Sequence, residues 1–155
     1  MRAAHAFAVA RASQEGAPPR RIVAGGHSVG AQLAAAIAAV APLDGLFELS
    51  GLYDLEPLRR SNVNATIAMD EATAARNAPL SMPPLRAGRL VVAAGEREQD
   101  EFHRQQRAYA AAWRAWGGDV TEVAAPGDDH FSIVLRLLDA QSELSRALAQ
   151  LLFSA

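Results

Sequence analysis

Short apolar runs that end at small residues alternate with helical segments along the whole chain. We expect strands at about 22–24, leading into Gly25 and Gly26, and at about 44–49, 90–94 and 120–123. We expect helices at about 1–14, from near Ser28 to Pro42, at about 99–116 and after His130. Runs this short are typical of strands that are buried on both faces. The alternation predicts an α/β fold, in which a parallel sheet of about four strands carries helices on both faces.

Three of the expected helices carry apolar residues at helical spacing. These stripes are Leu33, Ile37 and Val40; Phe102, Tyr109, Trp113 and Trp116; and Leu137, Leu144, Leu148 and Leu151. The aromatic stripe could form a binding face, but packing on a sheet is the commoner use of such a pattern. Segment 53–84 instead mixes short helical pieces with prolines, so we expect an excursion above the sheet that shapes a substrate pocket.

The composition excludes several classes of partner and chemistry. The chain has 155 residues, of which 50% are hydrophobic and 21% charged, as in a single globular domain. A net charge of −2 provides no broad basic surface, so neither nucleic acid nor a membrane is an expected partner. Without cysteine there is no disulfide, thiol nucleophile or Cys-ligated metal site. Without lysine there is no Schiff-base chemistry from a lysine side chain.

The N-terminal segment favours an ordinary first helix. Residues 1–12 are rich in alanine but lack the uninterrupted apolar core of a signal peptide. No apolar run reaches the roughly 18 residues that a membrane-spanning helix needs. We therefore expect a cytoplasmic protein.

The segment from Gly26 to Gly30 is a G-x-S-x-G motif between a predicted strand and a predicted helix. In this context the serine, Ser28, lies exposed on a sharp turn and acts as a nucleophile. Both glycines are expected to be required because the turn leaves no room for side chains. The Val29 N–H, at the start of the helix, is a candidate oxyanion donor. The alternative is a serine that merely caps the helix.

A serine nucleophile needs a base, and four histidines are candidates. His5 and His103 lie within predicted helices, and His27 lies inside the motif, where we expect it to point away from the serine. His130 alone follows a strand near the end of the sheet, which completes the order Ser, acid, His. His130 is therefore the predicted general base. The alternative is a loop histidine that caps the last helix.

The third member of such a triad is a carboxylate that orients the histidine, and it is expected after the third strand. Glu96, Glu98, Asp100 and Glu101 all lie there, and spacing alone does not choose among them. Acidic residues at a helix start often only stabilise the helix dipole, which suits Asp100 and Glu101.

Three segments resemble the kynurenine formamidases (arylformamidases) of the α/β-hydrolase superfamily. They are residues 95–105, GEREQDEFHRQ; 50–58, SGLYDLEPL; and 129–134, DHFSIV. In the pattern of this family the catalytic aspartate falls three residues after the glycine, so the resemblance implies that Glu98 is the acid. It also implies an α/β-hydrolase fold, a small amide or ester as substrate, with N-formylkynurenine favoured, and neither a metal nor an organic cofactor.

The sequence also departs from the family pattern. Glutamate replaces the usual aspartate at position 98, and Asn77 and Ala78 stand where a serine commonly precedes the proline. The upstream His-Gly-Gly segment, which lends oxyanion donors in the family, has no counterpart here. We therefore expect residues 1–155 to form one truncated domain, the C-terminal portion of the fold, which alone is poorly stable and nearly inactive. A general carboxylesterase and a non-catalytic remnant are the alternatives, and a homo-oligomer is possible.

Overall fold

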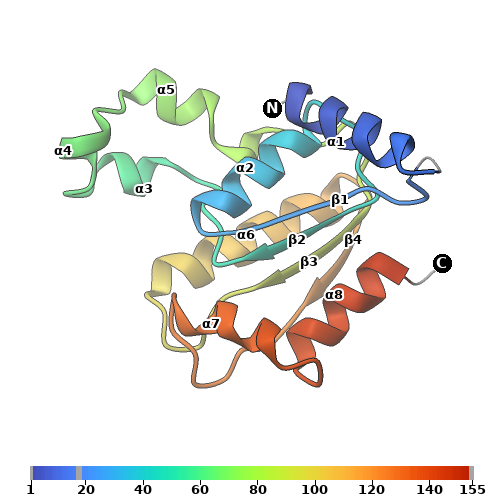
Figure 1. Ribbon diagram of the computed structural model, residues 1–155. Coiled ribbons are helices and arrows are strands. Elements are labelled where there is room, and N and C mark those ends of the chain that lie inside the picture. Colours follow the sequence, from blue (N-terminus) through green and yellow to red (C-terminus); the bar gives the residue numbers. More distant parts are fainter. Residues whose placement is uncertain (1, 17–18, 154–155) are drawn as a thin grey trace.

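The four predicted strands form one parallel sheet in the computed structural model, which describes residues 2–16 and 19–153 (Figure 1). The strand order in space is the order along the chain. The strands are β1 (Val23–His27), β2 (Gly45–Leu49), β3 (Arg89–Ala93) and β4 (Asp119–Glu122). In register, Gly26 of β1 lies opposite Glu48 of β2, which lies opposite Val92 of β3. Because all strands run in one direction, the segments that follow them meet at one edge of the sheet.

Helices cover both faces of the sheet, so the predicted fold class is confirmed. Helices α2 (Val29–Ala38) and α6 (Asp100–Ala115) pack on one face, while α7 (Ser132–Leu135) and α8 (Glu143–Phe153) pack on the other. Tyr109 and Trp113 of α6 are buried against the first face. The aromatic stripe is therefore mainly a packing surface, as expected.

The packing face of α2 differs from the predicted stripe. Its buried residues are alanines, namely Ala31, Ala34, Ala35, Ala36 and Ala38, whereas Leu33 is 48% exposed. Small side chains let this helix lie close to the sheet, which its position directly after β1 requires. The helix also ends at Ala38, before Val40 and Pro42, because the chain turns there into β2.

The predicted C-terminal helix is interrupted. Helix α7 leads into the 3-10 turn η2 (Arg136–Leu138), and α8 starts only at Glu143. Ser142 explains the break, because its hydroxyl accepts from the Ser145 N–H and donates to the Arg136 carbonyl oxygen. Leu144 and Leu151 of α8 are buried, and Leu137 and Leu148 pack beside them.

The predicted excursion lies between β2 and β3 and extends away from the sheet (Figure 1). It contains α3 (Glu56–Arg59), α4 (Asn64–Ile67), α5 (Glu71–Arg76) and the 3-10 turn η1 (Pro79–Ser81). The excursion has an apolar core of its own, formed by Leu55, Met69, Ala74 and Ala78.

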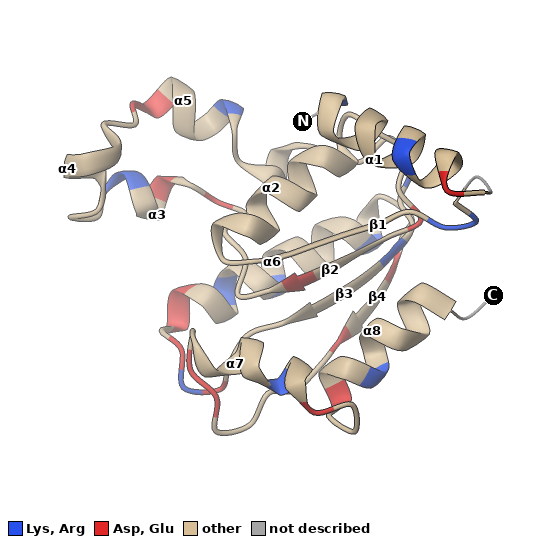
Figure 2. Ribbon diagram, in the orientation of Figure 1, with Lys and Arg blue, Asp and Glu red and all other residues tan. Residues whose placement is uncertain are grey.

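The first helix and the first strand contain no fully buried residue. Helix α1 (Arg2–Gln14) has no buried residue, and Phe7 on it is 71% exposed. Strand β1 lies at one edge of the sheet and β4 at the other. Acidic and basic residues are interspersed along the ribbon (Figure 2). None of the helices within the described residues is long and apolar enough to cross a membrane.

Candidate active site

Ser28 lies on a tight turn between the end of β1 and the start of α2. Its φ of 57° and ψ of −121° place it in a region that residues with a side chain rarely adopt. The Ser28 N–H donates to the Leu49 carbonyl oxygen at 2.9 Å, which anchors the turn to β2. Strain of this kind is found where a turn must present a side chain, and here it presents the Ser28 hydroxyl.

The two glycines of the motif do not serve the same purpose. A Cβ at Gly26 would lie 2.2 Å from the backbone carbon of Gly30, so the close crossing of β1 and α2 requires glycine there. A Cβ at Gly30 would meet nothing within 4 Å. The expectation that both glycines are sterically required is therefore wrong for Gly30 in the described structure.

We expect Gly26→Ala to destabilise the chain by about 1 to 3 kcal/mol or more, because backbone atoms would have to move. The matched change Gly30→Ala should be neutral or stabilise the chain by up to about 1 kcal/mol, because alanine favours a helix. Urea unfolding of the two variants beside the unchanged chain measures both effects. Equal destabilisation by the two changes would contradict the assigned crossing.

The structure brings Ser28, His130 and Glu98 together in a single hydrogen-bonded chain. The Ser28 hydroxyl donates to His130 Nε2 at 3.1 Å, and His130 Nδ1–H donates to Glu98 Oε2 at 2.9 Å. The Glu98 side chain is fully buried and the His130 side chain is 23% exposed. This arrangement lets His130 remove the hydroxyl proton while Glu98 stabilises the charged imidazole.

The loops that carry Glu98 and His130 are joined to each other by backbone hydrogen bonds. The Arg97 N–H donates to the Asp128 carbonyl oxygen at 2.8 Å, and the Glu96 N–H donates to the Ala125 carbonyl oxygen at 3.0 Å. Gly95 allows this approach, because a Cβ there would lie 2.6 Å from the Asp128 carbonyl oxygen. The acid and the base are thus held at a fixed separation before any substrate binds.

The other acidic candidates have other partners. Glu96 accepts from the Gly127 N–H at 2.8 Å, which adds to the junction of the two loops. Glu101 binds Arg104 in the first turn of α6, where Asp100 also lies. The helix-start role that the sequence suggested for Asp100 and Glu101 therefore agrees with their positions.

His27 lies against His130 and so contacts the candidate base, a role that the sequence did not suggest. Its Nε2–H donates to the His130 carbonyl oxygen at 2.6 Å, and the two ring centres are 4.6 Å apart. Burial lowers the pKa of His27, which favours the neutral ring that makes this single donation. His5 and His103 remain on α1 and α6.

Sequence reasoning missed two side chains, His27 as a support of the His130 backbone and Ser50 as a partner of Glu98. The Ser50 hydroxyl donates to Glu98 Oε1 at 2.5 Å. A signal for Ser50 existed, because it directly follows β2, the neighbour of the strand that carries Ser28. Small polar residues at the carboxyl ends of parallel strands commonly line functional sites.

Val29 is the first residue of α2, and the first N–H groups of a helix have no acceptor within it. Its N–H therefore stays available beside Ser28, at the positive end of the helix dipole. The predicted oxyanion role of Val29 fits this position. It is the one such donor that we assign among the described residues.

Two cavities flank the ring of Phe102, whose centre lies 4.6 Å from that of His130. One, of about 380 Å³, is lined by residues that include Glu98, Phe102 and His130. The other, of about 270 Å³, is lined largely by apolar residues of the excursion and α6, namely Leu52, Pro57, Leu58, Val63 and Phe102. The excursion thus contributes to a pocket next to the site.

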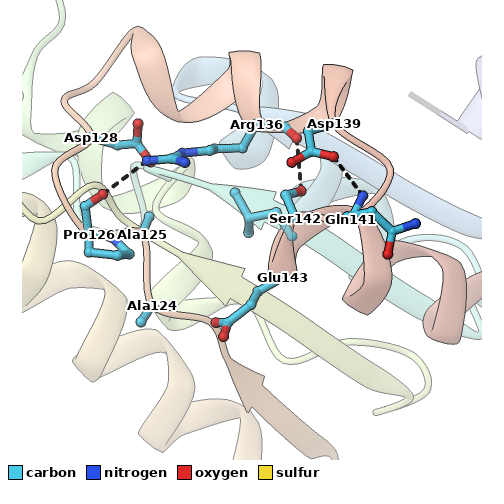
Figure 3. A pocket seen from close by; sticks show the side chains of 10 residues that line it. Ala124, Ala125, Pro126, Asp128, Arg136, Asp139, Gln141, Ser142 and Glu143 are labelled. Carbon is cyan, nitrogen blue, oxygen red and sulfur yellow. Dashed lines mark hydrogen bonds and ion pairs between the residues drawn. The ribbon is translucent and has the colours of Figure 1, made fainter.

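A third cavity, of about 380 Å³, is lined by the loop that precedes His130 and by residues from η2 to the start of α8 (Figure 3). Arg136 crosses it, with its Nε 2.6 Å from Asp128 Oδ2 and a terminal nitrogen that donates to the Pro126 carbonyl oxygen at 3.1 Å. These contacts tie the loop that precedes His130 to η2. Across residues 2–16 and 19–153, no cluster of His, Asp and Glu could hold a metal ion.

Comparisons with known proteins identify relatives that are similar to this chain in sequence. No family model matches the chain. The kynurenine formamidase of Salmo salar is 35% identical over 141 residues, and that of Danio rerio is 33% identical over 140; both matches cover 82% of this chain. The chain spans about half, 48%, of the length of these two relatives.

A solved structure of a candidate thioesterase from Silicibacter sp. TM1040 is also similar. It superposes with a TM-score of 0.74 and 28% identity, over 92% of this chain and 55% of the thioesterase chain. The likeness in sequence and the likeness in fold therefore extend over most of the described residues.

Proposed function

We propose that this chain, which is a kynurenine formamidase-like α/β-hydrolase, carries the reacting groups of a serine hydrolase that cleaves a small amide or ester. The observation that carries the proposal is the hydrogen-bonded series from Ser28 through His130 to the buried Glu98. An aryl formamide such as N-formylkynurenine is the favoured substrate, because the two curated relatives are named for such an activity.

In the first step the Ser28 oxygen attacks the carbonyl carbon of the substrate while His130 Nε2 takes the hydroxyl proton. The Val29 N–H donates to the oxygen that becomes negative. As the tetrahedral intermediate collapses, His130 returns the proton to the leaving amine nitrogen or alcohol oxygen. The acyl group, formyl in the favoured case, remains bound to Ser28.

In the second step a water molecule attacks the acyl carbon, and His130 takes one of the water protons. The bond to Ser28 then breaks, and the proton returns to the serine oxygen. The acid is released and the starting state is restored. Glu98 stabilises the charged His130 in both steps without itself taking a proton.

The test is labelling of the 155-residue chain with a fluorophosphonate, which bonds to an activated serine. Labelling needs only one attack by the serine and no turnover of a substrate, so it reports directly on activation of Ser28. Ser28→Ala should abolish labelling and leave the unfolding curve unchanged, whereas the exposed Ser81→Ala should label normally. Undiminished labelling of Ser28→Ala would contradict the nucleophile, and a folded chain that never labels would favour a non-catalytic remnant.

A general carboxylesterase is the second candidate, favoured by the likeness to a protein named as a candidate thioesterase, a class that removes acyl groups from thioesters. The two functions differ in the size of the acyl group, since formyl is smaller than any other acyl group. Rates of hydrolysis of an aryl formamide, an acetate and a butyrate ester of the same aryl group distinguish them. Preference for the formamide supports the first function, and preference for the butyrate supports the second.

A further inference from the structure

We propose that Ser50 is a positioning residue, which holds the Glu98 carboxylate in the orientation that His130 requires; this inference rests on the proposed function. The two oxygens of Glu98 have different partners. Oε2 accepts from His130 Nδ1–H, while Oε1 accepts from the Ser50 hydroxyl at 2.5 Å and from the Gly95 N–H at 2.7 Å. Among the described residues, Ser50 supplies the one side-chain donor to Oε1.

A glutamate at this position needs more support than an aspartate would. Its side chain has one more rotatable bond, so fixing the carboxylate costs more conformational entropy. The side chain is fully buried, so water does not take the place of a missing donor. Two donors on Oε1 direct Oε2 toward His130, and the short Ser50 contact has the length of a hydrogen bond to a charged oxygen.

The backbone of Ser50 gives an independent reason to assign a role to its hydroxyl. Ser50 is 1% exposed and has a φ of 51°, in the left-handed region that favours glycine. Its N–H donates to the Ala93 carbonyl oxygen at 2.7 Å, which holds this conformation at the end of β2. A residue with a side chain is thus kept where glycine would be less strained, and that side chain is the one that contacts Glu98.

Two substitutions at position 50 distinguish the effect of the hydroxyl from the effect of the backbone strain. Ser50→Ala removes the hydroxyl and keeps the backbone strain, whereas Ser50→Gly removes the hydroxyl and relieves the strain. We expect both variants to label with the fluorophosphonate about 10- to 100-fold more slowly than the unchanged chain, because a hydrogen bond to a charged group is lost. In urea unfolding, Ser50→Gly should be the more stable of the two. The exposed Ser81→Ala is the control and should change neither property.

The proton between His130 Nδ1 and Glu98 provides a second readout that does not depend on labelling. Its downfield NMR signal should shift or broaden in Ser50→Ala and Ser50→Gly, and stay unchanged in Ser81→Ala. Labelling of Ser50→Gly at the unchanged rate, or an unchanged proton signal in it, would overturn the inference. An unchanged chain that is folded but never labels would overturn the proposed function instead, and the proton signal would still decide the contribution of Ser50.

Discussion

Replacing Glu98 by glutamine is expected to slow the reaction of Ser28 by several orders of magnitude. The reason lies in the partners of position 98. The Ser50 hydroxyl and the Gly95 N–H both donate to Oε1, so the glutamine oxygen must stay there and its NH₂ group must face His130 Nδ1. His130 would then carry its proton on Nε2, which faces Ser28 and could no longer accept the hydroxyl proton. In a serine protease triad the equivalent change lowers kcat by about 10⁴-fold.

The measurement is the second-order rate constant for fluorophosphonate labelling, beside two matched acid-to-amide changes. Asp100→Asn, in the first turn of α6, should leave the rate nearly unchanged. Glu96→Gln removes a negative charge from the loop that carries Glu98. It tests whether any negative charge near His130 supports labelling, or only the carboxylate that contacts His130 Nδ1. If Asp100→Asn slowed labelling more than Glu98→Gln, the acid would have to be reassigned to Asp100.

The second large effect concerns a buried carboxyl group beneath the site. Glu48 lies in the middle of β2 and has no exposed surface. Its carboxyl group lies near the buried Tyr53 hydroxyl, but neither carboxyl oxygen is in hydrogen-bonding geometry with a described group. Burial raises the pKa of Glu48 from the ordinary 4.5 to about 8. Between these two values the folded chain keeps a proton that the unfolded chain has released.

The free energy of unfolding should therefore fall as the pH rises from about 4.5 to about 8, and Glu48 alone should contribute a loss of at most about 5 kcal/mol. Glutamine has the shape of the protonated acid and does not ionise. Glu48→Gln should thus remove this part of the pH dependence and make the chain more stable than the unchanged protein near pH 8.

Urea unfolding at a series of pH values measures the difference between the two proteins, which cancels the groups they share. His27 is one such group, since its lowered pKa makes stability rise with pH in the range below 6.5. The exposed Glu71→Gln is the control and should follow the unchanged chain. Parallel curves for Glu48→Gln and the unchanged chain would show that Glu48 is ionised in the folded state.

The local pattern of the sequence was sufficient to predict the strands, the fold class and the position of Ser28 between a strand and a helix. Apolar runs and the glycines beside them act within a few residues, so their effect can be seen in the sequence itself. The pattern failed where packing overrides it. Alanines rather than Leu33 form the buried face of α2, because the helix approaches the sheet closely, and Ser142 interrupts the last helix with its own hydrogen bonds.

For the candidate site, the sequence alone predicted a nucleophile and a base, from the motif around Ser28 and the loop position of His130. The choice of Glu98 among four acids came from a family resemblance, and only the tertiary structure shows its contact with His130. The roles of Ser50, His27 and Glu48 are also visible only in the tertiary structure. Their contacts or their burial involve residues that are far apart in the chain. Contacts of this kind depend on the register of β1, β2 and β3, which local patterns do not encode, and so only the folded sheet decides them.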